Sequence, residues 1–164
     1  MKVYVASSWR NEERQQAMVR LLRAAGCEVY DFRKDEDGRE GFTAWELLGE
    51  GDHRTWDTAT FRDILTQSRR AREFFARDMD ALRSAEACVL VLPCGRSAHL
   101  ELGWAAGAGR RCVVLLEPGT QPELMYLMAA DAVCVTAAEV LAALGLDATA
   151  PNLPARDIET LTPA

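Results

Sequence analysis

The sequence is short of the residues that build metal sites. It has only two histidines, His53 and His99, and its five cysteines include no Cys-x-x-Cys pair. Zinc sites are built from cysteines and histidines that cluster at short, regular spacings. Three of the cysteines lie in apolar runs, where a free cysteine behaves as a small hydrophobic residue. We therefore expect no metal ion and no other cofactor.

Long apolar runs and an excess of positive charge are also missing. No apolar stretch approaches the roughly 20 residues that a membrane-spanning helix needs. The formal net charge of −6 argues against binding of a nucleic-acid backbone. An apolar strand that begins at Lys2 leaves no room for a signal peptide. We expect a cytoplasmic protein that binds neither a membrane nor a nucleic-acid polymer.

Short apolar runs alternate with helical patterns along most of the chain, which predicts βαβ units and a parallel sheet. The predicted strands are residues 2–6, 28–32, 88–92, 111–116 and 132–135. The predicted helices begin after Asn11, at Thr58, at Arg69, after Ser97, at Pro122 and at Ala137. We expect one α/β domain over residues 1–146, a doubly wound, parallel five-stranded sheet in the flavodoxin-like order 2-1-3-4-5.

Two segments depart from this alternation. Residues 33–57 are polar and glycine-rich, yet they contain Trp45 and Trp56. A long irregular insert is often a functional lid, and tryptophan suits both stacking on a nucleobase and packing in a surface cluster. Both interpretations stay open at this point. Residues 147–164 hold three of the six prolines, and we expect a tail that is either disordered or held against another subunit.

The stretch from Val89 to Trp104 is the most informative. An apolar strand ends at Pro93 and Gly95, and Ser97 is a good N-cap for the helix that follows. Glu101 shares a helix face with Ser97 and follows the carboxyl end of the strand, where open α/β folds bind ligands. The helix N-terminus favours the ionised carboxylate. Glu101 is therefore a candidate nucleophile, although acids are also common in the first turns of ordinary helices.

The predicted strand order brings a second loop to the same edge. Strands one and three are neighbours, so the loop after the first strand lies beside residues 94–101. The residues of this loop that we expect at the site are Ser7, Ser8 and Trp9. His99 lies about 200° around the helix from Glu101, which predicts a packing or interface role. Gly103 and Gly107 lie one turn apart, which suits close approach to the sheet or to a partner helix.

Three motifs occur together in this order along the chain. They are the strand end Ala6-Ser7-Ser8-Trp9-Arg10, an aspartate on the helix before the third strand, and Ser97-x-x-x-Glu101-x-Gly103. Together they resemble the nucleoside 2-deoxyribosyltransferase-like superfamily. That superfamily includes deoxyribosyltransferases and nucleoside 5′-monophosphate N-glycosidases, and is distantly related to TIR domains. The resemblance covers about residues 2–144.

The resemblance implies the roles of two carboxyl groups. Glu101 would attack the anomeric carbon of the sugar, and Asp78 would protonate or hold the departing base. Asp80 takes the place of Asp78 if the helix register differs. Such chemistry needs one ionised carboxylate and one carboxyl able to donate a proton. The ordinary alternative for Asp78 is an exposed acid on an amphipathic helix.

One departure from the family pattern bears on the substrate. Deoxyribosyltransferases usually carry an acid six positions before the nucleophile, where this chain has Gly95. Gly95, Arg96 and Ser97 instead offer backbone N–H groups, a guanidinium and a hydroxyl, which could hold a phosphate. This favours a nucleotide N-glycosidase over a base-exchanging transferase. Arg96 equally fits an ordinary surface position.

The resemblance also implies sites that a neighbouring subunit completes. Residues 124–128 form an apolar run too continuous for one buried stripe of a short helix, so part of it should face outward. We expect a homodimer or a larger homo-oligomer.

The sequence therefore predicts an enzyme that cleaves the N-glycosidic bond of a nucleoside or nucleoside 5′-monophosphate. The reaction would pass through a covalent glycosyl–Glu101 intermediate, by hydrolysis or by transfer to another base. The alternative is a non-catalytic nucleotide-sensing module, or a TIR-like, NAD-cleaving signalling module, that uses the same site.

Overall fold

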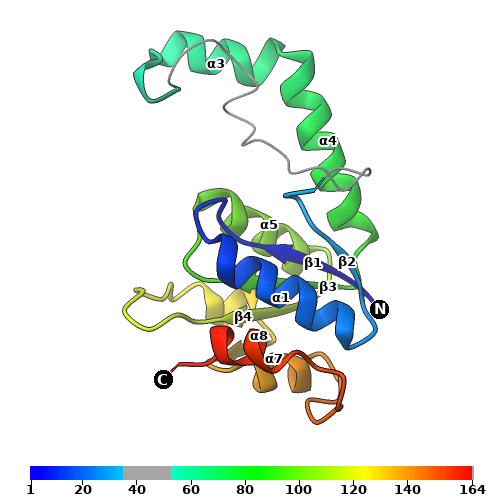
Figure 1. Cartoon of the computed structure of the whole chain (residues 1–164). Coiled ribbons are helices and arrows are strands. Elements are labelled where there is room, and N and C mark those ends of the chain that lie inside the picture. Colours follow the sequence, from blue (N-terminus) through cyan, green and yellow to red (C-terminus); the bar gives the residue numbers. More distant parts are fainter. Residues whose placement is uncertain (35–52, 164) are drawn as a thin grey trace. The chain divides into compact units, whose positions relative to one another are not determined.

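The structure is a computed structural model that describes residues 1–34 and 53–163 (Figure 1). The chain divides into two compact units. The sheet unit comprises Met1–Asp31 and Leu82–Ala164, and the helical unit comprises Phe32–Ala81. The chain thus leaves the sheet unit once, after its second strand, and returns to it near the end of a helix.

Five strands form the sheet, and their order confirms the predicted fold class. They are β1 (Lys2–Ala6), β2 (Glu28–Tyr30), β3 (Ala87–Val91), β4 (Arg111–Leu115) and β5 (Ala132–Cys134). The order is β2-β1-β3-β4-β5, and every neighbouring pair is parallel. All five residues of β3 are buried, as expected for a strand that is covered on both faces. The observed ends lie within two residues of the predicted ones.

Helices cover both faces of the sheet. Successive side chains of a strand point to opposite faces, and Val5, Val89 and Val113 occupy one row across three strands. This row belongs to one core cluster with residues of α1 (Glu12–Ala24), α7 (Ala137–Ala143) and α8 (Ala155–Leu161). On the opposite face, the Sγ atom of Cys112 lies 3.8 Å from the carbonyl oxygen of Leu102, on α5 (Arg96–Gly107). The sheet is therefore doubly wound.

Two predicted helix starts are wrong. Helix α5 begins at Arg96, with Gly95 rather than Ser97 at the N-cap, because the extended backbone of Gly95 already supplies the cap geometry. Glu101 is consequently the sixth residue of α5. It lies beyond the first turn of the helix, and the macrodipole acts most strongly within that first turn. Pro122 does not begin a helix, and α6 (Tyr126–Ala129) is a single turn that starts four residues later.

The C-terminal segment packs against its own chain, so the expectation of a disordered tail or a tail bound to another subunit is wrong. Leu161 of α8 is fully buried in the core cluster. Arg20 of α1 donates three hydrogen bonds of 2.6–3.2 Å to the carboxylate of Asp157. Asn152 Nδ2 donates to the carbonyl of Ala24 at 2.6 Å. These contacts pair residues more than 120 positions apart, which composition does not reveal.

The helical unit contains the short 3₁₀ turn η1 (His53–Thr55), α3 (Thr58–Gln67) and most of α4 (Arg69–Ser84). Both helices begin at the predicted residues, Thr58 and Arg69. Asp57 caps α3, because its Oδ1 atom accepts a hydrogen bond of 2.7 Å from the backbone N–H of Thr60. Within the described residues, no helix is long and apolar enough to span a membrane.

Candidate functional site at the carboxyl edge of the sheet

Direct hydrogen bonds join the loop that follows β1 to the last residue of β3, as the strand order predicts. Ser7 Oγ donates to the carbonyl of Val91 at 2.8 Å. Asn11 Nδ2 donates to Ser7 Oγ at 3.2 Å and lies 3.4 Å from the same carbonyl. Asn11 is the N-cap residue of α1, but its side chain makes these contacts and not a capping bond. The hydroxyl proton of Ser7 is thereby used within the protein.

Glu101 lies at this edge, close to the end of β3. Its side chain is half-buried, and its negative charge contributes to the raised pKa of two nearby thiols. Burial raises the pKa of the Cys94 thiol to about 12, and the negative charge of Glu101 adds to this effect. Burial also raises the pKa of Cys88, with smaller contributions from Cys112 and Glu101. Cys94 therefore stays protonated at neutral pH and is a poor nucleophile, which leaves Glu101 as the candidate.

The first turn of α5 is open to solvent. Gly95, Arg96 and Ser97 are all exposed. A Cβ atom added to Gly95 would meet nothing within 4 Å, and the extended backbone of Gly95 suits any residue. An acid at this position would therefore fit, so neither the turn nor the local packing requires glycine. The first backbone N–H groups of the helix, which have no intrahelical partner, lie in this exposed turn.

His99 contacts Tyr126 and the N-cap, a pairing that the sequence did not indicate. Its Nδ1 atom lies 2.9 Å from the carbonyl of Gly95, and its Nε2 atom lies 2.8 Å from the hydroxyl of Tyr126. A carbonyl can only accept, so we assign the proton to Nδ1 and the acceptor role to Nε2. The two rings also stack, with centroids 5.8 Å apart. His99 therefore ties α5 to α6, in agreement with the predicted packing role.

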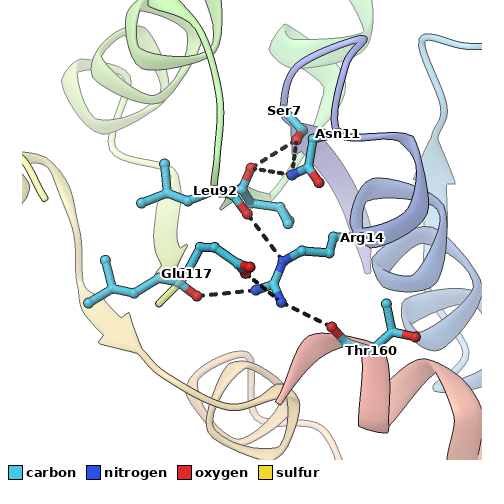
Figure 2. A network of polar contacts seen from close by, with 8 residues as sticks. Ser7, Asn11, Arg14, Leu92, Glu117 and Thr160 are labelled. Atoms are coloured by element: carbon cyan, nitrogen blue, oxygen red, sulfur yellow. Dashed lines mark hydrogen bonds and ion pairs between the residues drawn. The ribbon is translucent and has the colours of Figure 1, made fainter. Parts of the chain in front are cut away.

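Arg14 of α1 joins several loop ends at this edge (Figure 2). Its guanidinium donates to the carbonyls of Leu92, Leu116 and Thr160 at 3.0–3.2 Å. Glu117 Oε2 lies 2.6 Å from Arg14 Nη1. Burial lowers the pKa of Arg14, and the negative charge of Glu117 opposes that shift. The sequence did not indicate this residue, because its partners are backbone carbonyls 78 or more positions away along the chain.

No family model matches the sequence, and no curated protein matches it. Among solved structures, the chain is similar to a 2-deoxyribosyltransferase from the psychrotolerant bacterium Bacillus psychrosaccharolyticus. The TM-score is 0.55 and the identity 17%, over 82% of this chain and 85% of that one. The chain is also similar to the CMP N-glycosidase BcmB of Clostridium botulinum, with a TM-score of 0.50 and 16% identity over 89% of this chain and 100% of that one.

The chain has a nucleoside 2-deoxyribosyltransferase-like fold. At the level of the fold, these similarities confirm the resemblance that the three motifs indicate. In an open α/β sheet of this order, the general expectation places a ligand where the loops after β1 and β3 diverge. Ser7, Glu101 and the first turn of α5 lie at that point in the nucleoside 2-deoxyribosyltransferase-like sheet unit.

Two predicted site residues belong to the helical unit, and a third lies outside the described residues. Asp78 is on α4 in the helical unit, where its Oδ1 atom lies 3.8 Å from Arg77 Nε. Trp56 is also in the helical unit, with its ring centroid 6.4 Å from that of Phe61. Trp45 lies outside the described residues. The approach of these residues to Glu101 stays a prediction.

The other two predicted contacts lie in the loop after β1. Trp9 is half-buried, and Ser8 Oγ accepts a hydrogen bond of 3.1 Å from the backbone N–H of Arg10. Among residues 1–34 and 53–163, no group of three histidine, cysteine or acidic side chains is placed to hold a metal ion.

Proposed function

We propose that the chain cleaves the N-glycosidic bond of a nucleoside or nucleoside 5′-monophosphate, with Glu101 as the nucleophile. The observation that carries this proposal is the position of Glu101 on α5, shortly after the carboxyl end of β3, at the edge where the loops after β1 and β3 diverge. The nucleoside 2-deoxyribosyltransferase-like fold supports it, because both similar structures belong to enzymes that act on nucleosides or nucleotides.

In the proposed reaction, a carboxylate oxygen of Glu101 forms a bond to the anomeric carbon of the sugar. The bond from that carbon to the base nitrogen breaks, its electron pair passes to the base, and Asp78 gives the base a proton. Water or a second base then attacks the same carbon and releases Glu101, and Asp78 recovers a proton. Desolvation of Asp78 by the bound substrate would raise its pKa and favour the protonated form.

The contacts proposed for the substrate follow from the exposed loops. Gly95, Arg96 and Ser97 would hold a 5′-phosphate through backbone N–H groups, a guanidinium and a hydroxyl. Ser7 offers a ligand only an acceptor lone pair, because its proton goes to Val91. The other residues proposed to line the substrate are Ser8, Trp9, Trp45 and Trp56.

The central test is release of free base, measured by chromatography with nucleosides, nucleoside 5′-monophosphates and NAD as substrates. Glu101→Gln should lower turnover by several orders of magnitude, while circular dichroism and nucleotide binding stay unchanged. Undiminished turnover in this variant would exclude the mechanism. Binding without turnover in the native protein would favour a sensing module, and cleavage of NAD alone would favour TIR-like chemistry.

The phosphate contact is tested by Arg96→Ala. The variant should lose about 1.5–3 kcal/mol of transition-state stabilisation with a monophosphate, the scale of a charge-assisted hydrogen bond. It should change little with the matching nucleoside. Equal losses on both substrates would show that Arg96 has no role in phosphate recognition.

The proposed assembly is a homodimer or a larger homo-oligomer. The predicted outward-facing run is confirmed, since Leu124, Met125, Leu127 and Met128 are 59–88% exposed. On α5, Gly103 and Gly107 are exposed and have open space around them, which excludes the expected approach to the sheet and leaves the approach of a partner helix. Light scattering at micromolar concentration should give a mass above 18.1 kDa, and Leu127→Glu should reduce it. A strict monomer would contradict this proposal.

A further inference from the structure

The side chain of Arg14 contacts the residues that follow two strands at the carboxyl edge of the sheet, and one residue of α8 (Figure 2). Its Nε atom donates to Leu92 at 3.2 Å, Nη2 donates to Leu116 at 3.2 Å, and Nη1 donates to Thr160 at 3.0 Å. Leu92 and Leu116 are the first residues beyond β3 and β4, and Thr160 belongs to α8. One partly buried guanidinium thus holds the ends of two strands and the C-terminal helix.

These carbonyls need a donor from outside the sheet ladder. The backbone hydrogen bonds that the sheet supplies stop where the strand ends. A buried carbonyl that is left without a hydrogen-bond donor costs free energy. The guanidinium presents five N–H groups in a rigid fork, whereas a lysine ammonium is a point charge on a flexible stem. Glu117 Oε2, 2.6 Å from Nη1, forms an ion pair with this fork. A lysine at this position would retain the positive charge, but it would lose the N–H groups that point separately at the three carbonyls.

The hold on β3 is reinforced one residue earlier. The carbonyl of Val91 accepts from Ser7 Oγ at 2.8 Å and lies 3.4 Å from Asn11 Nδ2. Two consecutive carbonyls, those of Val91 and Leu92, are therefore held by side chains of α1 and the loop before it. Only three residues, 93–95, separate Leu92 from the start of α5. The direction in which the chain leaves β3 determines where α5 begins.

We propose that Arg14 is a positioning residue for Glu101. By fixing the carbonyl of Leu92, it fixes the path of residues 93–95 and hence the first turns of α5, which carry Glu101. Arg14 does not touch the substrate in this proposal and acts through the loop. The inference rests on the proposed role of Glu101 as nucleophile. Misplacement of a reacting group by about 1 Å can cost a factor of about 100 in rate, so loosening this loop should affect turnover strongly.

Arg20 supplies a matched control on the same helix. Like Arg14, it ties α1 to α8, through three hydrogen bonds to Asp157. Within the part of the chain that the structure describes, its side chain bonds to Asp157 and to no group of the β3–α5 loop. Arg14→Lys and Arg20→Lys therefore both weaken the docking of α8, but only the first releases Leu92.

The experiment compares the two variants at a temperature at which circular dichroism shows both to be folded. Arg14→Lys should lower kcat for base release about tenfold or more, with KM for a nucleoside within threefold of the native value. Arg20→Lys should keep kcat within twofold. Hydrogen exchange of the Leu92 amide, which donates to the carbonyl of Leu115 at 3.1 Å, should accelerate at least tenfold in Arg14→Lys and remain native in Arg20→Lys. Glu117→Gln, which keeps the three carbonyl bonds, should show smaller changes of the same kind.

Three outcomes would overturn the proposal. They are an equal loss of kcat in the two variants, accelerated exchange of the Leu92 amide with native kcat, and native exchange of that amide in Arg14→Lys. If Arg14→Lys does not fold, Glu117→Gln decides by the same measurements. If the native protein releases no base from any substrate, the proposed function fails, while the exchange measurement still decides whether Arg14 holds the loop.

Discussion

The sheet unit and the helical unit are stabilised in different ways. All five residues of β3 are buried, whereas α3 has no buried residue and α4 has only Leu82, which belongs to the sheet unit. The helices of the helical unit instead show local signals, such as the Asp57 cap and the ion pair between Arg69 and Glu73. Among the described residues, burial therefore stabilises β3 of the sheet unit, whereas short-range interactions support α3 and α4.

The largest difference in the free energy of unfolding should come from truncating one leucine to alanine in each unit. Leu90→Ala on β3 removes a fully buried side chain and should lower the free energy of unfolding by about 3 kcal/mol. Leu65→Ala on α3, where the side chain is 52% exposed, should change it by less than about 0.5 kcal/mol. Urea unfolding followed by circular dichroism measures both. Similar losses would show that the two units do not differ in this way.

Removing a helix cap from each unit sharpens the contrast. Thr136 Oγ1 accepts from the backbone N–H of Glu139 at 3.2 Å at the start of α7, and Ser68 Oγ accepts from that of Ala71 at 3.2 Å at the start of α4. Thr136→Ala should cost about 1 kcal/mol of global stability, because α7 packs on the sheet. Ser68→Ala should accelerate hydrogen exchange in the first turn of α4 only. A global loss in Ser68→Ala would contradict this expectation.

A smaller effect should come from the contact between α5 and α6. Tyr126→Phe keeps the ring that stacks on His99 but removes the hydroxyl that donates to Nε2. The loss of one partly buried hydrogen bond should cost about 0.5–1 kcal/mol, measured by urea unfolding. Nuclear magnetic resonance of the His99 ring should also show a changed Nε2 environment. An unchanged signal would rule out the assigned hydrogen bond.

The smallest effect should come from acidification, which weakens the N-cap of α3. The N–H of Thr60 donates to the carboxylate of Asp57 and lowers its pKa below 3.8. Because the folded-state pKa is depressed, the cap stabilises α3 above the unfolded pKa, and this stabilisation is lost as the pH falls through the folded value. Amide exchange within residues 58–67 should therefore rise on acidification below about pH 4, relative to Asp57→Asn. The sheet unit should not respond through this group, and a flat profile would contradict the assignment.

The comparison also explains which parts of the site could be predicted. Ser7 and Glu101 were predicted at one edge because parallel strands of known order bring their carboxyl ends together, and the bond from Ser7 to Val91 shows that the loop after β1 contacts the end of β3. Arg14 and the pair of His99 with Tyr126 escaped prediction, since their partners are backbone carbonyls or residues 27 or more positions away. No local pattern identifies such partners. Asp78 stays a prediction because it belongs to the other unit.

The sequence by itself determined the alternation of strands and helices, the parallel sheet with order β2-β1-β3-β4-β5, and the position of Glu101 shortly after β3. These depend on hydrophobic periodicity and on chain connectivity, which are local properties. Tertiary structure alone decided that residues 155–161 dock on α1, that Gly95 and not Ser97 caps α5, and that Arg14 holds Leu92. The docking of residues 155–161 and the contact of Arg14 with Leu92 require a polar or apolar group to find a distant partner, and the free energy of such a contact exists only once the sheet has formed.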